Sequence, residues 1–303
     1  MALVIRRYAE VGPSNARLQT VVHPSALVTQ RFPQAACDIQ IDDAQPGILD
    51  TLDEFMARQG YVYAPHVPES GNPRGYVRGF VTAWTTNSRV TIGAGDCRSS
   101  DNTTDIVLAA PTVVDITVAG VGGLDTGAEA ANAWYYPHVI ADSTGINPTS
   151  VILSASPIAP TLPTGYDKFR RVGSVRNTAA ANFRAFTTSG AGAERAVQYS
   201  DPITMRQVLA GGAAASAVTP VACGILIPPT SRLGWFQYAQ RGTVDGSFYE
   251  DPANAVGNMQ RTLIPGSLAC DKIRVSATRE IGYANTGAGG AIDIWVIGYD
   301  EVL

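Results

Sequence analysis

The side chains best suited to nucleophilic or acid–base chemistry are spread thinly along this chain. Its three histidines, His23, His66 and His138, lie in separate segments, each next to a proline. Serine, cysteine and zinc hydrolases place a histidine beside a nucleophile or metal, in patterns such as Gly-x-Ser-x-Gly or His-Glu-x-x-His. The sequence contains neither pattern. We therefore expect His138, in the run YYPHVIAD, to be a packed imidazole and not a catalytic base.

Hydrolysis of a glycosidic bond needs two carboxyl groups held across a sugar-binding groove. The sequence offers these candidates for such a pair: Asp125, Glu129, Asp142, Glu194 and Asp245. Their spacing selects no pair, and the chain has no internal repeat of the kind that builds a β-helix. We expect a protein that is not an enzyme, with a polysaccharide hydrolase as the least favoured alternative.

Candidate metal ligands are equally sparse. The run Asp101-Asn-Thr-Thr-Asp105 offers oxygen ligands for Ca²⁺, but it lacks the glycine and distal glutamate of an EF-hand loop, and an Asx turn uses the same residue types. The cysteines are widely separated, with no histidine at metal-ligand spacing: Cys37, Cys97, Cys223 and Cys270. We expect a turn at 101–105, buried free thiols, and neither a metal nor a cofactor.

Charge limits the classes of partner. The 303 residues carry a formal net charge of −4, and only 16% are charged. Nonspecific nucleic-acid binding needs clustered Lys and Arg, so we expect no nucleic-acid partner. The uncharged span 207–231 is rich in Gly and Ala and interrupted by prolines, so we expect no membrane partner either. Low charge favours either a surface covered by neighbouring chains or a β protein with many turns.

The elements that must position these residues are strands. Runs of strand-like alternation recur every ten or so residues from residue 77 onward, which is typical of a sandwich or jelly roll. They are 77–84, 89–93, 105–109, 112–119, 133–142, 151–155, 169–176, 182–187, 196–199, 221–227, 234–239, 271–277 and 291–299. We predict a mainly β fold, with an antiparallel sandwich body over 77–303 that has one or two subdomains.

The first 60 residues differ in character from the body. Short extended runs separated by prolines lead to one predicted helix at 46–59, which begins at Pro46 and stops at Gly60. Its apolar face carries Ile48, Leu52, Phe55 and Met56. That face packs either on its own domain or on symmetry copies around a three-fold axis. We therefore predict an attachment or oligomerisation segment over 1–60, followed by a Pro/Gly-rich linker over 61–76.

Two aromatic clusters lie inside predicted strands, Trp134-Tyr-Tyr136 and Trp235-Phe-Gln-Tyr238. Alternation sends one member of each neighbouring pair inward and the next outward. Core filling explains the inward members, while an outward ring offers a platform for a sugar or a neighbouring chain. We name Tyr135 and Phe236 as candidate surface-recognition aromatics.

Three segments resemble a module of tailed-bacteriophage virion proteins. They are LDTG-x-EAA-x-x-WYY at 124–136, APTLP-x-GY at 159–166 and RR-x-G-x-V at 170–175. The resemblance covers roughly a quarter to a third of the chain and implies a virion location, after assembly in the host cytoplasm. It implies a non-enzymatic structural protein, homo-oligomeric and favoured as a trimer, attached through its N-terminal segment to capsid or tail proteins as a short fibre, decoration or tail-associated component.

A second function stays open within the same setting. An adhesin at the tail tip would use exposed aromatics and loops such as 142–148 to bind a receptor or a glycan of the host surface. Binding to host glycans would favour the adhesin, whereas binding only to assembled capsids or tails would favour the structural role.

Overall fold

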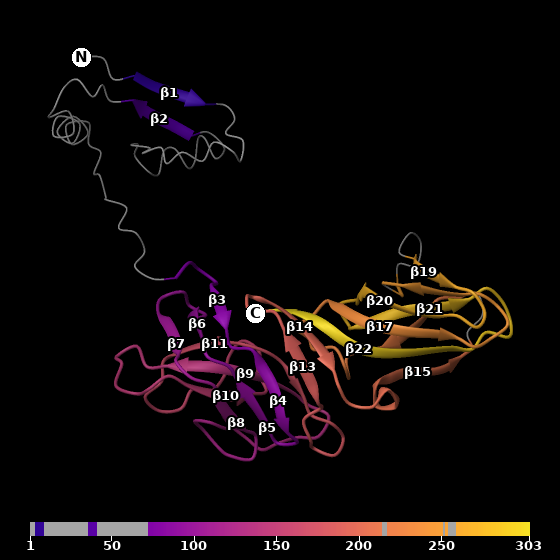
Figure 1. Cartoon of the computed structure of the whole chain (residues 1–303), viewed down its shortest axis with the longest axis horizontal. Helices are drawn as coiled ribbons and strands as arrows, with labels where there is room; N and C mark the ends of the chain where they lie inside the picture. Colours follow the sequence, from indigo (N-terminus) through magenta and orange to yellow (C-terminus); the bar gives the residue numbers. More distant parts are fainter. Residues whose placement is uncertain (1–3, 9–35, 41–71, 214–216, 251, 254–258) are drawn as a thin grey trace. The chain divides into compact units, whose positions relative to one another are not determined.

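The computed structural model describes residues 4–8, 36–40, 72–213, 217–250, 252–253 and 259–303. The chain divides into two compact units, Met1–Ser70 and Gly71–Leu303. In the first unit, β1 (Val4–Tyr8) pairs antiparallel with β2 (Ala36–Gln40) (Figure 1). The predicted helix at 46–59, with its face of Ile48, Leu52, Phe55 and Met56, lies outside the described residues.

The body begins at Gly71, earlier than the expected residue 77. The backbone N–H of Asn72 donates to both carboxylate oxygens of Asp105, at 3.2 and 3.1 Å. The N–H of Gly75 donates to Oδ1 of Asn102 at 2.8 Å. The described end of the predicted linker is therefore fastened to the body.

Three antiparallel sheets form the first part of the body. One has the order β3 (Val77–Gly79), β6 (Gly95–Arg98), β7 (Asp105–Leu108), and another the order β4 (Thr82–Thr86), β5 (Arg89–Ile92), β8 (Thr112–Asp115). In the third, β9 (Trp134–Ala141) pairs with β10 (Ser150–Ser154), β11 (Lys168–Arg171) and β12 (Val175–Arg176). The long strand β9 thus joins two segments that the sequence analysis singled out, 124–136 and 170–175.

Two larger antiparallel sheets form the second part (Figure 1). The first, which we call the large sheet, has the order β13 (Phe186–Ser189), β14 (Glu194–Tyr199), β22 (Ile292–Val302), β17 (Leu233–Gln240), β20 (Leu268–Arg274), and β15 (Gln207–Gly212) also pairs with β22. The second has the order β16 (Thr219–Ala222), β21 (Glu280–Asn285), β18 (Gly246–Tyr249), β19 (Met259–Leu263).

Side-chain alternation joins these two sheets into a sandwich. Along β17, Phe236 and Tyr238 are fully buried, while Trp235 and Gln237 are half-buried on the other face. The ring of Tyr238 stacks on that of Phe248 from the second sheet, with centroids 4.1 Å apart. Stacked aromatic rings of this size contribute a large share of core burial. The predicted mainly β fold is therefore confirmed.

A conformational break divides the first predicted strand, 77–84, into β3 and β4. Gly79 has φ +79° and Phe80 has φ 51°, which is left-handed backbone that ends a strand. A Cβ at Gly79 would lie 2.3 Å from the carbonyl oxygen of Ala94, so only glycine fits there. Phe80 is completely buried, and its packing offsets the backbone strain.

The described residues contain a single 3₁₀ turn, Ile203–Arg206, and no α-helix. Nothing helical in the described part of the chain has the length and apolarity to cross a membrane.

Candidate functional site

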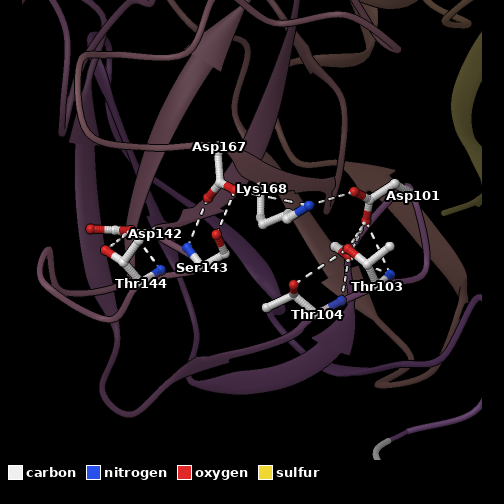
Figure 2. Close-up of polar contacts among 9 residues, drawn as sticks. Asp101, Thr103, Thr104, Asp142, Ser143, Thr144, Asp167 and Lys168 are labelled. Carbon is white, nitrogen blue, oxygen red and sulfur yellow. Dashed lines mark hydrogen bonds and ion pairs between the residues drawn. The ribbon is translucent and has the colours of Figure 1, made fainter. Parts of the chain in front are cut away.

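Three loops of the body meet in one polar group, the loop cluster, formed by residues 99–104, 142–148 and 163–168 (Figure 2). Because β9 and β11 are antiparallel with Ala141 opposite Lys168, the end of β9 meets the beginning of β11. The ammonium of Lys168 lies 2.7 Å from Oδ2 of Asp101, and Asp167 accepts hydrogen bonds from the N–H and hydroxyl of Ser143 at 2.7 and 2.6 Å.

Asp101 forms the turn that the sequence predicts. Its Oδ1 accepts from the hydroxyls of Ser99 and Thr103, at 2.6 and 2.8 Å, and from the N–H of Thr103 at 3.1 Å. Its other oxygen faces Lys168. These contacts are those of an Asx turn. Among the described residues, no three His, Cys, Asp or Glu side chains are grouped to hold a metal ion.

Asp142 fastens the loop 142–148. Its carboxylate accepts from the N–H and hydroxyl of Thr144 and from the N–H and amide of Asn147, at 2.5 to 3.0 Å. The hydroxyl of Tyr166 donates to the carbonyl of Pro148 at 3.0 Å. Ile146 nevertheless stays 83% exposed. The loop therefore presents a bulky apolar side chain on a backbone that is already ordered.

The electrostatics of the loop cluster keep its carboxylates ionised. Hydrogen bonds from Lys168 to Asp101, from Thr144 to Asp142 and from Ser143 to Asp167 hold the pKa of each carboxyl below its usual value. The contact with Asp101 in turn raises the pKa of Lys168. A general acid needs the opposite shift. This arrangement is suited to ordering loops and not to proton transfer.

The other candidate carboxylates of a glycosidase are scattered. Asp125 accepts from the N–H of Thr161 at 2.8 Å, and Glu129 accepts from the amide of Asn177 at 2.9 Å. Glu194 is exposed on β14, and Asp245 is half-buried before β18. Asp125, Glu129 and Asp142 thus each accept hydrogen bonds from a different set of partners.

His138 is a packed imidazole, as predicted. It is completely buried on β9, its Nδ1–H donates to the carbonyl of Tyr136 at 2.9 Å, and its ring meets the edge of Phe169. Burial lowers the pKa of His138 to about 4. The side chain is therefore neutral at neutral pH.

The cysteine prediction is right at two of the three described positions. Cys97 and Cys223 are buried free thiols, and burial raises the pKa of each to about 12. Cys270, in contrast, is exposed. It lies on the outward face of β20 with Lys272 and Arg274, whereas Ile273 on the other face is buried. Cys37 lies on β2, whose side chains are outside the described part of the structure.

The prediction of Tyr135 and Phe236 as surface aromatics is wrong. Tyr135 is 2% exposed, and its hydroxyl accepts from the N–H of Ala130 at 2.7 Å. Phe236 is fully buried on the inner face of the large sheet, where it stacks on Tyr238. On β17 the strand register turns Phe236 inward. The strand β9 is instead buried on both faces, since Tyr136 is also 2% exposed.

Both tryptophans are half-buried: Trp235 lies on the outer face of β17, while Trp134 packs against the core. The indole N–H of Trp134 donates to the carbonyl of Gly224 at 3.0 Å. That of Trp235 donates to Oδ1 of Asp300 at 3.0 Å, and the ammonium of Lys272 lies 4.2 Å from the ring centroid of Trp235. An indole can be half-buried at low cost when its N–H keeps a hydrogen-bond partner, as both do here.

A groove of about 590 Å³ is lined in part by Leu233, Lys272 and Asp300, and we call it the basic groove. Four basic and three acidic side chains line it: Arg195, Arg232, Lys272, Arg274, Glu194, Asp300 and Glu301. Its volume is that of a small-molecule site. Sequence reasoning missed this groove because its residues come from β14, β17, β20 and β22 and from the segment before β17, which no local motif links.

Glu301 is a buried carboxylate at the junction of the two parts of the body. It is 1% exposed, and its Oε1 accepts from Arg171, Ser174 and Thr230. Arg171 also donates to the carbonyl of Val302 at 2.6 Å, and Arg170 donates to that of Leu303 at 2.9 Å. The RR-x-G-x-V segment thus holds the last strand.

No protein-family model matches this chain, and no curated protein matches it significantly.

Proposed function

We propose that this chain is a non-enzymatic structural component of a tailed-phage virion. It assembles as a homo-oligomer, with a trimer as the favoured state. Its N-terminal segment attaches it to the capsid or the tail, as a short fibre, a decoration or a tail-associated protein. One observation carries the proposal: the residues that resemble phage virion proteins serve as framework, since Tyr135 is buried and Arg170 and Arg171 hold the end of β22.

Exposed apolar side chains support assembly with other chains. Val107, Val113, Val118 and Val121 are 43–56% exposed, in a protein whose charged residues make up only 16%. Burying such side chains stabilises an interface by about 25 cal/mol per Å² of apolar surface. Sister subunits or other virion proteins would cover them.

The mass of the full chain in solution tests the assembly. We expect light scattering to give three chain masses, unchanged on dilution. Leu52→Asp should lower the mass by placing a charge in the predicted three-fold contact, while Glu54→Ser, on the opposite face of the predicted helix, should leave it unchanged. A stable monomer of the unaltered chain would refute the homo-oligomer. A separate test is the density of the assembled phage particle: absence of this chain from that density would refute the virion location.

The alternative function, an adhesin that binds the host receptor or a glycan, is favoured by the loop 142–148. Asp142 orders this loop, and Ile146 is 83% exposed at its tip. If the loop binds a host surface, Ile146→Ser in the full chain should weaken cell binding at least tenfold. Ile158→Ser is the matched control, since Ile158 is 79% exposed on another loop. Equal binding by both variants would exclude the loop as the contact.

A further inference from the structure

The basic groove runs across the outer face of the large sheet. In the strand register, Leu233 of β17 lies opposite Arg274 of β20 on one side and opposite Asp300 of β22 on the other. Glu194 of β14 lies opposite Val302 of β22. The groove therefore extends over three strand spacings, about 14 Å, from Arg274 to Glu194.

The basic end of the groove holds charges that the protein does not neutralise. Lys272 is paired with Asp300 at 2.8 Å, and the buried Glu301 is paired with Arg171. Arg232 and Arg274 are both exposed, and neither has a carboxylate partner among the described residues. Both line the groove, and Arg232 lies one residue away from Arg274 in the pairing, because the N–H of Val275, the residue after Arg274, donates to the carbonyl of Arg232 at 3.0 Å. In a chain of net charge −4, the groove thus holds two guanidinium groups without a carboxylate partner among the described residues; Arg232 donates one hydrogen bond, to the carbonyl of Ser276 at 3.3 Å.

We propose that the basic groove binds a short acidic saccharide, with the sugar carboxylate held by Arg232 and Arg274. Guanidinium groups bind carboxylates through paired, charge-assisted hydrogen bonds. At the other end, Ser189 and the exposed carboxylate of Glu194 are hydrogen-bonding groups for sugar hydroxyls. This inference goes beyond the structural role proposed above and does not depend on it.

The floor of the groove favours a saccharide over an acidic peptide. A peptide in an extended conformation gains affinity by adding to a free strand edge. The strands β14, β22 and β17 are paired on both sides, so their backbone groups are already used. The strand β20 is at the edge of the sheet, but its free edge faces away from β17 and therefore away from the groove, which extends from β20 toward β14. What remains is a surface of side chains, with Leu233 and Ala196 between the charged ends. That surface suits a saccharide, whose hydroxyl groups can donate hydrogen bonds to these side chains and accept hydrogen bonds from them.

Calorimetry on the full chain tests the proposal with trigalacturonic acid as the probe. Its methyl ester is the matched neutral probe, since it keeps the rings and loses the charge. We expect the acid to bind at least tenfold more tightly than the ester, and this preference to shrink as NaCl is raised. Arg232→Gln and Arg274→Gln should each weaken binding of the acid about tenfold. Glu194→Gln should strengthen it, because it removes the uncompensated negative charge.

Arg78→Gln is the control for loss of positive charge, since Arg78 is exposed on β3 and does not line the groove. It should leave binding unchanged. Equal affinity for the acid and its ester, or unaltered binding by Arg274→Gln, would overturn the proposal. Tighter binding of hexaglutamate, with the same dependence on Arg274, would overturn it in favour of an acidic peptide.

Discussion

At the scale of single residues, burial fixes the protonation of His138. The unfolded chain binds a proton at this side chain near pH 6.5, and the folded chain binds it only near pH 4. Folding stability should therefore fall as the pH drops from about 6.5 to about 4. Between pH 7 and pH 5 we expect a loss of about 2 kcal/mol from this group, measured by urea unfolding at each pH.

His138→Asn provides the comparison, because its amide can still donate to the carbonyl of Tyr136 that Nδ1 of His138 contacts. The stability of the variant at pH 7 will differ from that of the unaltered protein. Between pH 7 and pH 5, however, its free energy of unfolding should fall by less, because the contribution of the imidazole is missing. Parallel curves for the two proteins would contradict a buried, neutral His138.

At the scale of elements, strands with clear alternation were predictable. The segments that became β9, β17 and β22 alternate or run apolar over eight or more residues, and each is central to its sheet. The missed strands have little such pattern: β6 reads GDCR, β15 QVLAGG, β18 GSFY, β19 MQRTL and β21 EIGYAN. These segments form strands because they pair with distant segments, and the local sequence pattern does not reveal that pairing.

The candidate site shows the same limit of sequence reasoning. Alternation predicts one inward and one outward aromatic in each cluster but does not decide which is which. The prediction of Tyr135 and Phe236 as the outward ones is wrong, because both are buried. A shift of one residue exchanges the two faces of a strand, and both faces are aromatic here. Asp101 was predictable as a turn because all its partners except Lys168 are local. Arg232 and Arg274 come together only through the pairing of β17 and the residue before it with β20 and the residue after it.

At the scale of the whole body, the contacts of Glu301 couple the sheets around β9 to the large sheet. Arg171 and Ser174 come from the first part, while Glu301 itself lies on β22. Gly79, from the first part, adds a second link, since its carbonyl accepts from Arg195 of β14. The two parts should therefore unfold together, because separating them would leave the carboxylate of Glu301 without its cationic partner.

Glu301→Gln should lower the free energy of unfolding by about 3 kcal/mol, since it leaves the guanidinium of Arg171 without its buried counter-ion. Asp96→Asn removes an ion pair whose arginine, Arg78, is 72% exposed, and should cost less than about 1 kcal/mol. Urea unfolding followed by tryptophan fluorescence measures both, because Trp134 and Trp235 lie in different parts of the body. If both variants lose the same small amount of stability, Glu301 does not couple the two parts, and their cohesion comes from other contacts.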